Sequence, residues 1–448
     1  MLVTIFVIYY YLMFIMDQII TKQDIMRKRI YKNEKSLVST LMLLSLFVDQ
    51  WNVFVVPMSN FFIKDSFIKT NLLFGLASGA IIGGAAVGSL LGGILSDRIG
   101  RKKVFVSNML IFIFADLGSA ISPDPAVFIA LRFIAGIAVG SDLANCYCFI
   151  MDAIGRGDRE VTGVKNTLMA SFAIMTINIL ILLLLFNNAD YVSIWRLTMG
   201  ISAVPALFAL LVSGYLGESP LWTKPSENGK PPRLEFIRKL RKDKLKWRTT
   251  KFSWISGIAS SVEVGTFAFF IPIIISNFRI SSIIDQRYLI IFIYSFGLPA
   301  GILGPKFLPK MGLKNLSIYG YTITLISLIG SGIFIVYGYY LIVPLFMILF
   351  VWGNHWNNQP ILTSQSLISD PQYRGSATGF SNFISEFPAF LSITIFPLMA
   401  GILGIGTSTL ILALAPATGL VVSIFLFREI YGYENSFTDN EKVQIDGA

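Results

Sequence analysis

Asp49 stands inside an apolar run of the sequence, in the stretch Leu-Phe-Val-Asp-Gln-Trp-Asn that covers residues 46–52. An ionisable side chain well inside a membrane-spanning helix costs roughly 3 kcal/mol on insertion scales, so such a residue is rarely without a role. A carboxyl group can take up and release a proton, which makes Asp49 a candidate proton carrier. A purely structural ion pair is the alternative interpretation.

Arg132 and Asp142 lie together in another apolar run, residues 125–151. Arginine stays charged at any working pH, so we predict that Arg132 pairs with Asp49 and that protonation of Asp49 releases it. For Asp142 two interpretations are open. It either assists the proton or faces a substrate, or it pairs with a cation at the end of its run.

A cluster of amides, Asn357, Asn358 and Gln359, occupies the apolar run 340–364. Amides in a span are costly unless they face a cavity or bond to a neighbouring helix. Because amides both donate and accept hydrogen bonds, they suit hydroxyl or carboxylate groups. We predict that these three residues, with Asn52 and Glu263, line a substrate site; interhelical hydrogen bonding is the alternative.

Other polar residues in apolar runs have weaker support. Asp116 and Glu386 match no motif, and they rank below Asp49 as functional candidates. His355 is the one histidine, and we favour a hydrogen-bonded structural residue over the alternative of a pH sensor. One histidine and two cysteines on one helix give no metal-binding pattern, so we expect no metal and no cofactor.

The elements that carry these residues are apolar helices. The chain has 448 residues, 54% hydrophobic and 14% charged, whereas a soluble protein carries about 25% charged residues. We predict an all-α polytopic membrane protein with twelve spans of about 20 residues each. They are expected near 37–60, 73–95, 104–121, 125–151, 166–187, 194–216, 253–276, 288–308, 316–338, 340–364, 377–402 and 406–427.

Positive charge is distributed unevenly around these spans, although the net charge is +10. Of the Lys and Arg residues, Arg132 falls within a span and five are expected on the far side: Lys64, Lys69, Arg196, Arg279 and Arg287. The rest fall on one side, which the positive-inside rule makes cytoplasmic. We therefore predict a multi-pass plasma-membrane protein with cytoplasmic basic loops and C-terminus. The net charge does not indicate a nucleic-acid partner, and we expect a monomer in the lipid bilayer.

The longest connection between spans divides the chain into two parts of six spans. The predicted organisation is an N-terminal hydrophobic segment and basic stretch (1–36), a first six-helix half (37–217), a cytoplasmic linker (218–252), a second half (253–427) and a cytoplasmic tail (428–448). For residues 1–16, an extra or interfacial helix and an over-extended start are both open. They lack the features of a secretory signal.

Glycines recur with four-residue spacing along the predicted span 73–95, in two series: Gly75, Gly79 and Gly83, then Gly84, Gly88 and Gly92. Small residues at this spacing let helix backbones approach closely in lipid. We therefore predict two tightly packed faces on this helix.

The same helix ends in a motif that runs from Gly93 through Asp97, Arg98 and Gly100 to Arg101 and Lys102. A carboxylate facing the start of the span near Gly375 would be stabilised by the positive end of that helix. The order Gly-x-x-x-Asp-Arg-x-Gly-Arg-Lys, between the second and third spans, resembles the signature of the major facilitator superfamily of secondary transporters. This resemblance implies a cytoplasmic gate formed by Gly93, Asp97, Arg98, Gly100 and Arg101.

Further segments are similar to the sugar-porter and metabolite:proton symporter branch of that superfamily. They are the stretch around Asp49, Arg-Phe-Ile-Ala-Gly at 132–136, and Gly-Glu-Ser-Pro-Leu-Trp at 217–222. The motif near Gly93 recurs in degraded form at 309–314, where a proline replaces the Asp. The resemblance implies that Asp49 carries a proton, whereas Asn52 replaces a second Asp of the family pattern.

The function implied is secondary active transport, by alternating access and proton symport, of a small metabolite such as a sugar, carboxylate or phosphate. A proton-coupled exporter and a facilitated-diffusion uniporter are the alternatives. The span 166–187 lacks the Gly-Pro-rich motif of exporters, and Asp49 argues against a uniporter. Arg132 is the one cation expected in the cavity, which favours a neutral or singly charged substrate. No catalytic cluster or phosphate-binding loop is present, so we expect neither an enzyme nor direct use of ATP.

Overall fold

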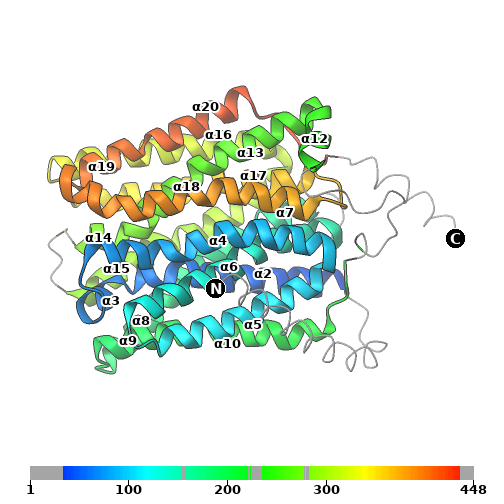
Figure 1. Ribbon diagram of the computed structural model, residues 1–448. Coiled ribbons are helices and arrows are strands. Elements are labelled where there is room, and N and C mark those ends of the chain that lie inside the picture. The colour runs from blue at the N-terminus through cyan, green and yellow to red at the C-terminus, as the bar shows by residue number, and fades with distance from the viewer. Residues whose placement is uncertain are drawn as a thin grey trace.

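The computed structural model describes residues 34–153, 158–219, 222, 235–276, 278 and 282–433. Residues 1–33 of the predicted N-terminal segment, residues 220, 221 and 223–234 of the predicted linker, and residues 434–448 of the predicted tail lie outside the described residues. Figure 1 shows long helices that run side by side in one bundle. Within the described ranges the chain is helical and has no strand, which confirms the predicted all-α class.

Most of the long helices begin and end within a few residues of the bounds expected from the apolar runs. The exceptions are a helix that begins at Lys244 rather than at 253, and the helix Gly297–Val336, which runs across two predicted spans. The helices of the first half are α2 (Glu34–Met58), α3 (Asn60–Ser66), α4 (Asn71–Ile99), α5 (Arg101–Ala120), α6 (Pro125–Ala153), α7 (Asp158–Gly163), α8 (Asn166–Phe186), α9 (Tyr191–Ile201) and α10 (Ala203–Val212). Those that follow are α12 (Glu235–Lys242), α13 (Lys244–Glu263), η3 (Val264–Ala268), α14 (Phe269–Ser276), α15 (Ile283–Ser295), α16 (Gly297–Val336), α17 (Val343–Ile368), α18 (Arg374–Leu403), α19 (Ile405–Leu412) and α20 (Leu414–Phe425).

Ten described helical stretches are long and apolar enough to cross a membrane, rather than the twelve predicted. Two features account for the difference. The stretch Ile283–Val336 has 54 residues, and Gly312, at φ 76°, interrupts it between two predicted spans. The amide-bearing helix α17 has 26 residues, which is long enough to span, but it is not among the ten.

The glycine series on α4 pack against two different helices. Backbone of α6 occupies the space that a Cβ atom would need at Gly84 and Gly88, and Ser141 of α6 does so at Gly92. The other series, Gly75, Gly79 and Gly83, faces Phe390 and Thr394 of α18. The predicted close packing is therefore confirmed, and α4 joins its own half to the other one.

The degraded repeat of the Gly93 motif has the same local structure as the original. Gly100 has φ 106° and Gly312 has φ 76°, a region that favours glycine. After Gly100, the backbone N–H of Arg101 donates to Glu218 at 2.8 Å. After Gly312, the backbone N–H of Leu313 donates to Glu429 at 2.9 Å. In each half a glutamate that follows the last span thus caps the helix that begins after the motif.

Candidate functional site

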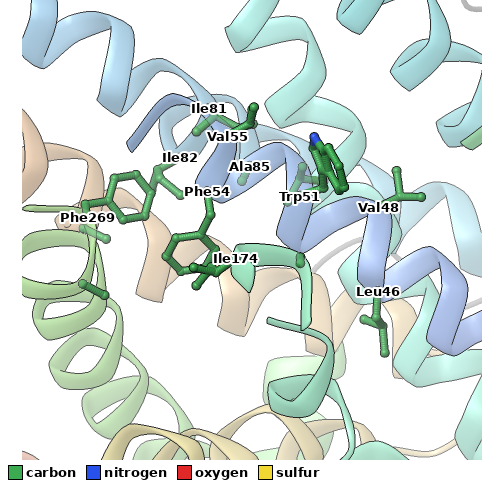
Figure 2. Packing of buried hydrophobic residues seen from close by; sticks show 14 of the residues in the cluster. Leu46, Val48, Trp51, Phe54, Val55, Ile81, Ile82, Ala85, Ile174 and Phe269 are labelled. Carbon is green, nitrogen blue, oxygen red and sulfur yellow. The ribbon is translucent and has the colours of Figure 1, made fainter. Parts of the chain in front are cut away.

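A cavity of about 120 Å³ lies at the centre of the bundle and is lined by helices of both halves. Its lining includes Asp49 and Phe54 of α2, Thr167 of α8, Ser260 of α13, Asn358 of α17, and Asn382 and Glu386 of α18. Of the residues predicted for a proton or substrate site, Asp49 and Asn358 line this cavity. Two of its apolar lining residues, Phe54 and Phe269, belong to the buried hydrophobic cluster that Figure 2 shows.

Asp49 is fully buried, and neither of its carboxylate oxygens has a hydrogen-bond partner among the residues that the structure describes. Two further buried polar atoms on the same cavity also lack partners, Ser260 Oγ and Asn382 Nδ2. Buried polar groups are normally hydrogen-bonded. Unpartnered atoms from both halves therefore converge on a space in which a polar ligand could satisfy them.

Arg132 pairs with Asp116 and not with Asp49, which corrects the predicted ion pair. Its Nη1 lies 3.2 Å from Asp116 Oδ1 and 3.1 Å from the side-chain oxygen of Asn52. Its Nη2 donates to the Asn52 carbonyl at 2.6 Å. Asn52 in turn donates to Asp116 at 3.1 Å. Asn52 lies about one turn beyond Asp49 on α2. Because Arg132 binds Asn52 and Asp116, it does not reach the cavity that Asp49 lines.

Asp142 also accepts hydrogen bonds in the first half, from Ser45 Oγ and, at 3.1 Å, from Asn108 Nδ2. Because both partners are neutral, the interpretation that Asp142 pairs with a cation finds no support in these contacts. Ser45 lies one turn before Asp49 on α2. Asp142 therefore links α6 to α2 and α5 next to the candidate proton carrier.

Three of the predicted substrate residues bond to neighbouring helices. Asn357 Nδ2 donates to Glu263 at 2.6 Å, inside the second half, and Gln359 Nε2 donates to Thr167 of α8 at 3.0 Å. Neither amide nor Glu263 is among the residues that line the cavity. For these positions the contacts match the alternative of interhelical hydrogen bonding.

His355 has partners for both ring nitrogens. Nδ1 lies 2.7 Å from the Val351 carbonyl oxygen, and Nε2 lies 2.9 Å from Ser171 Oγ on α8. This confirms the expected hydrogen-bonded role. The contact with Ser171 also ties α17 to the first half beside the cavity.

At one end of the bundle, Asp97 accepts hydrogen bonds at the start of α18. Its carboxylate accepts from the backbone N–H groups of Gly375, at 3.0 Å, and Ser376, at 2.7 Å. Ser376 Oγ donates to it as well, at 2.7 Å. The predicted contact with the positive end of this helix is confirmed. Gly93 packs directly on Gly375, so no side chain separates the two halves here.

Arg101 extends this contact into a network of charges. Its guanidinium lies 3.2 Å from Asp97, 3.2 Å from Asp152 and 3.1 Å from the Pro371 carbonyl oxygen. Asp152 also binds Arg374 of the second half. We call the residues Asp97, Arg101, Asp152 and Arg374 the Asp97 cluster. Arg98, in contrast, is exposed.

Next to the Asp97 cluster, Asp370 accepts hydrogen bonds from Lys246 Nζ at 2.7 Å and from the Tyr373 hydroxyl at 2.8 Å. Burial, and then the adjacent Asp370, raise the pKa of Tyr373. Tyr373 therefore remains a neutral donor. These contacts tie the first turn of α13 to the connection between α17 and α18.

At the opposite end, Arg287 of α15 joins the two halves. Its Nη1 donates to the Met58 carbonyl of α2 at 2.6 Å and lies 3.3 Å from Asn178 Oδ1 of α8. Its guanidinium lies 5.3 Å from the centre of the Phe62 ring. The halves are therefore in contact on both sides of the central cavity.

The sequence-based prediction of the site omits Asp152 and Arg374, and it ranks Asp116 and Glu386 low. Asp152 and Arg374 belong to two matching Asp-x-x-x-Arg-Gly segments, 152–157 after the fourth predicted span and 370–375 after the tenth, and this symmetry is a usable signal. For Asp116 and Glu386 the sequence shows the depth in the membrane but not the face of the helix.

The sequence model of the Major Facilitator Superfamily matches residues 40–393. The probable metabolite transport protein CsbC of Bacillus subtilis (strain 168) is 26% identical over 408 residues, 83% of this chain and 86% of that protein. The arabinose-proton symporter of Escherichia coli (strain K12) is 27% identical over 183 residues, 41% of this chain and 37% of that protein. The chain spans less than two fifths of the length of this symporter and of the putative metabolite transport proteins YwtG and YncC of Bacillus subtilis.

Among solved structures, the proton:xylose symporter XylE bound to 6-bromo-6-deoxy-D-glucose resembles this chain with a TM-score of 0.76. The superposition covers 89% of this chain and 97% of that one, at 16% sequence identity. At this identity the likeness establishes the fold alone.

Proposed function

The chain belongs to the Major Facilitator Superfamily, and we propose that it is a secondary transporter that moves a small hydroxyl-bearing metabolite together with a proton. The central cavity carries this proposal. Unpartnered polar atoms of Asp49, Ser260 and Asn382 reach it from both halves. The names of its relatives, an arabinose-proton symporter among them, support a sugar or a polyol.

The charges around the cavity favour a substrate without negative charge over a carboxylate or phosphate. Among the described residues that line it there is no Lys or Arg, whereas Asp49 and Glu386 are both present. Arg132, the cation expected there from the sequence, is bound to Asp116 instead. An anion would therefore enter a space that holds carboxyl groups and no counter-charge.

Asp49 is the residue we propose to carry the proton. A buried carboxyl group without a partner is far less costly as the neutral acid than as the ion. When the cavity opens to water on either side, hydration stabilises the ion and the proton can leave. A protein that closes only when Asp49 is protonated would thus move one proton with each substrate.

The two halves, 37–217 and 253–427, would rock about this cavity, with 218–252 as the linker. We place the Asp97 cluster at the cytoplasmic end of the plasma-membrane protein, because the basic connections lie on that side of the predicted spans. The cluster would then hold the cytoplasmic gate closed, and the contact of Arg287 with Met58 would lie at the outer end.

Transport in liposomes tests this proposal. Wild type should accumulate a labelled sugar or polyol from a panel when an inward proton gradient is imposed. Asp49→Asn should lose this accumulation and its dependence on pH, but should still exchange labelled for unlabelled substrate across the membrane. Glu263→Gln is the matched control, since Glu263 is a buried acid outside the cavity lining, and it should keep gradient-driven accumulation.

Other outcomes would favour the alternatives. Uptake that equilibrates and ignores the gradient in wild type would indicate a uniporter. Substrate driven out of liposomes by an inward proton gradient would indicate an exporter. Accumulation by Asp49→Asn at the wild-type rate would exclude Asp49 as the proton carrier.

A further inference from the structure

Glu386 contributes a second carboxyl group to the central cavity. It lies on α18 in the second half, whereas Asp49 lies on α2 in the first. Within the described part of the chain Glu386 makes no hydrogen bond or ion pair, and it is partly accessible. The lipid-facing side of α18 carries Phe387 and Leu391, which are exposed. Glu386 lies beside this side, on the part of the helix that lines the cavity.

The two buried arginines that could neutralise Glu386 bind other groups. Arg132 binds Asp116 and Asn52, and Arg287 binds the Met58 carbonyl at the end of the bundle. An ionised carboxylate at this depth requires a partner, because an unpaired charge in the membrane interior is costly. No described residue supplies one to Glu386, so a cationic group on a bound molecule can serve as that partner.

Two other features of the cavity suit a cation with hydroxyl groups. Phe54 and Phe269 line it with ring centres 5.5 Å apart, and aromatic faces attract cations. Unpartnered Ser260 Oγ, Asn382 Nδ2 and the fully buried Asp49 also reach the cavity. These atoms provide donors and acceptors for hydroxyl groups beside the carboxyl group of Glu386.

We propose that the cavity selects a substrate that carries a protonated amine in addition to hydroxyl groups, with Glu386 as the residue that pairs with the ammonium group. This inference rests on the proposed transport function and specifies its substrate class. In this proposal Asp49 remains the proton carrier, and Glu386 recognises the positive charge of the substrate. A substrate bound in this way contacts both halves, so its binding favours the closed state in which the halves approach one another.

Matched pairs of neutral and amino compounds test the inference. The probes are labelled glucose with glucosamine, and labelled glycerol with its 2-amino analogue, bound to purified wild-type protein below the pKa of each amine. At least one amine should bind at least tenfold more tightly than its neutral partner. Glu386→Gln should reduce this preference to less than threefold, and Glu386→Asp should restore part of it. An unchanged thermal unfolding midpoint in Glu386→Gln would show that the fold is kept.

Each contrary result has a distinct meaning. Equal or tighter binding of the neutral compounds by wild type would overturn the amine proposal and leave the proposed sugar or polyol transport standing. A preference that survives Glu386→Gln would remove Glu386 from substrate recognition. If the variant instead changed only the number of protons moved per substrate, Glu386 would be a second proton site. Binding of neither class would contradict both proposals.

Discussion

Arg132 and Asp116 form a buried pair whose members depend on each other, whereas Asp49 depends on no partner. Removing one member of a buried ion pair leaves an uncompensated charge and costs about 3–5 kcal/mol. We therefore expect Asp116→Asn to lower the unfolding midpoint of the purified protein in detergent by several degrees. Asp49→Asn replaces an unpartnered acid by a neutral isostere, and we expect its midpoint to be equal to or higher than that of wild type.

Thermal unfolding of the two variants, followed by intrinsic tryptophan fluorescence, makes this comparison. Equal destabilisation by both substitutions would show that Asp49 has a structural partner after all. Asp190→Asn provides a reference, because Asp190 caps α9 at an exposed position. Its loss should cost no more than a typical capping interaction, about 1 kcal/mol.

At single residues the sequence was informative where a motif fixed both position and partner. Asp97 was expected at the start of the helix near Gly375, and it accepts hydrogen bonds from Gly375 and Ser376. Arg132 was paired with Asp49, which is wrong, because depth along a helix does not specify the direction of a side chain. Asn52 lies one turn beyond Asp49 and brings Arg132 to Asp116.

Close packing of whole helices gives a sharper prediction. A Cβ atom added at Gly88 of α4 would overlap the Ile137 backbone of α6, whereas nothing lies within 4 Å of a Cβ atom at Gly401. Gly88→Ala should therefore force α4 and α6 apart and lower both the unfolding midpoint and transport. Gly401→Ala, in helical conformation near the end of α18, should be neutral or more stable by about 0.5–1 kcal/mol.

Purified variants and transport assays at matched expression decide between these outcomes. If Gly88→Ala were as stable and active as Gly401→Ala, the α4–α6 contact would be looser than described. At the scale of elements the sequence predicted this contact well, since the four-residue glycine spacing alone indicated two packed faces. It did not indicate which helix covers each face, because glycine spacing carries no information about the partner.

For the molecule as a whole, the Asp97 cluster joins the two halves at one end of the bundle, and we propose that it holds this end closed. Asp97→Asn removes a charge that accepts three hydrogen bonds from the start of α18, and bonds to a charged group are worth about 1.5–3 kcal/mol each. A net loss of about 2 kcal/mol would raise the population open at this end roughly 30-fold. We expect faster labelling of a cysteine placed at Ser261, on the cavity wall, by an impermeant maleimide added from that side.

The labelling experiment uses a background in which Cys146 and Cys148, both buried, are replaced by alanine. Asp190→Asn, on a connection outside the cluster, should label at the parent rate. Equal labelling of the Asp97→Asn variant and its parent would show that the remaining contacts of Arg101 and Arg374 suffice for closure. Hydropathy predicts the helices of both halves, whereas the contacts that join the halves at each end of the bundle are long-range, such as that of Arg287 with Met58.

The cap that Glu218 forms on α5 also affects the order in which the two halves fold during translation. Glu218 accepts a hydrogen bond from the N–H group of Arg101, which lies 117 residues earlier in the sequence. It is nevertheless present as soon as the sixth span has left the ribosome. The first half can then fold before α18 covers the glycine face of α4 that it contacts. At about 5–20 residues per second, the approximately 156 residues up to Arg374 take roughly 8–30 s to add. Throughout that interval the nascent chain offers this flat face to lipid and to the insertion machinery.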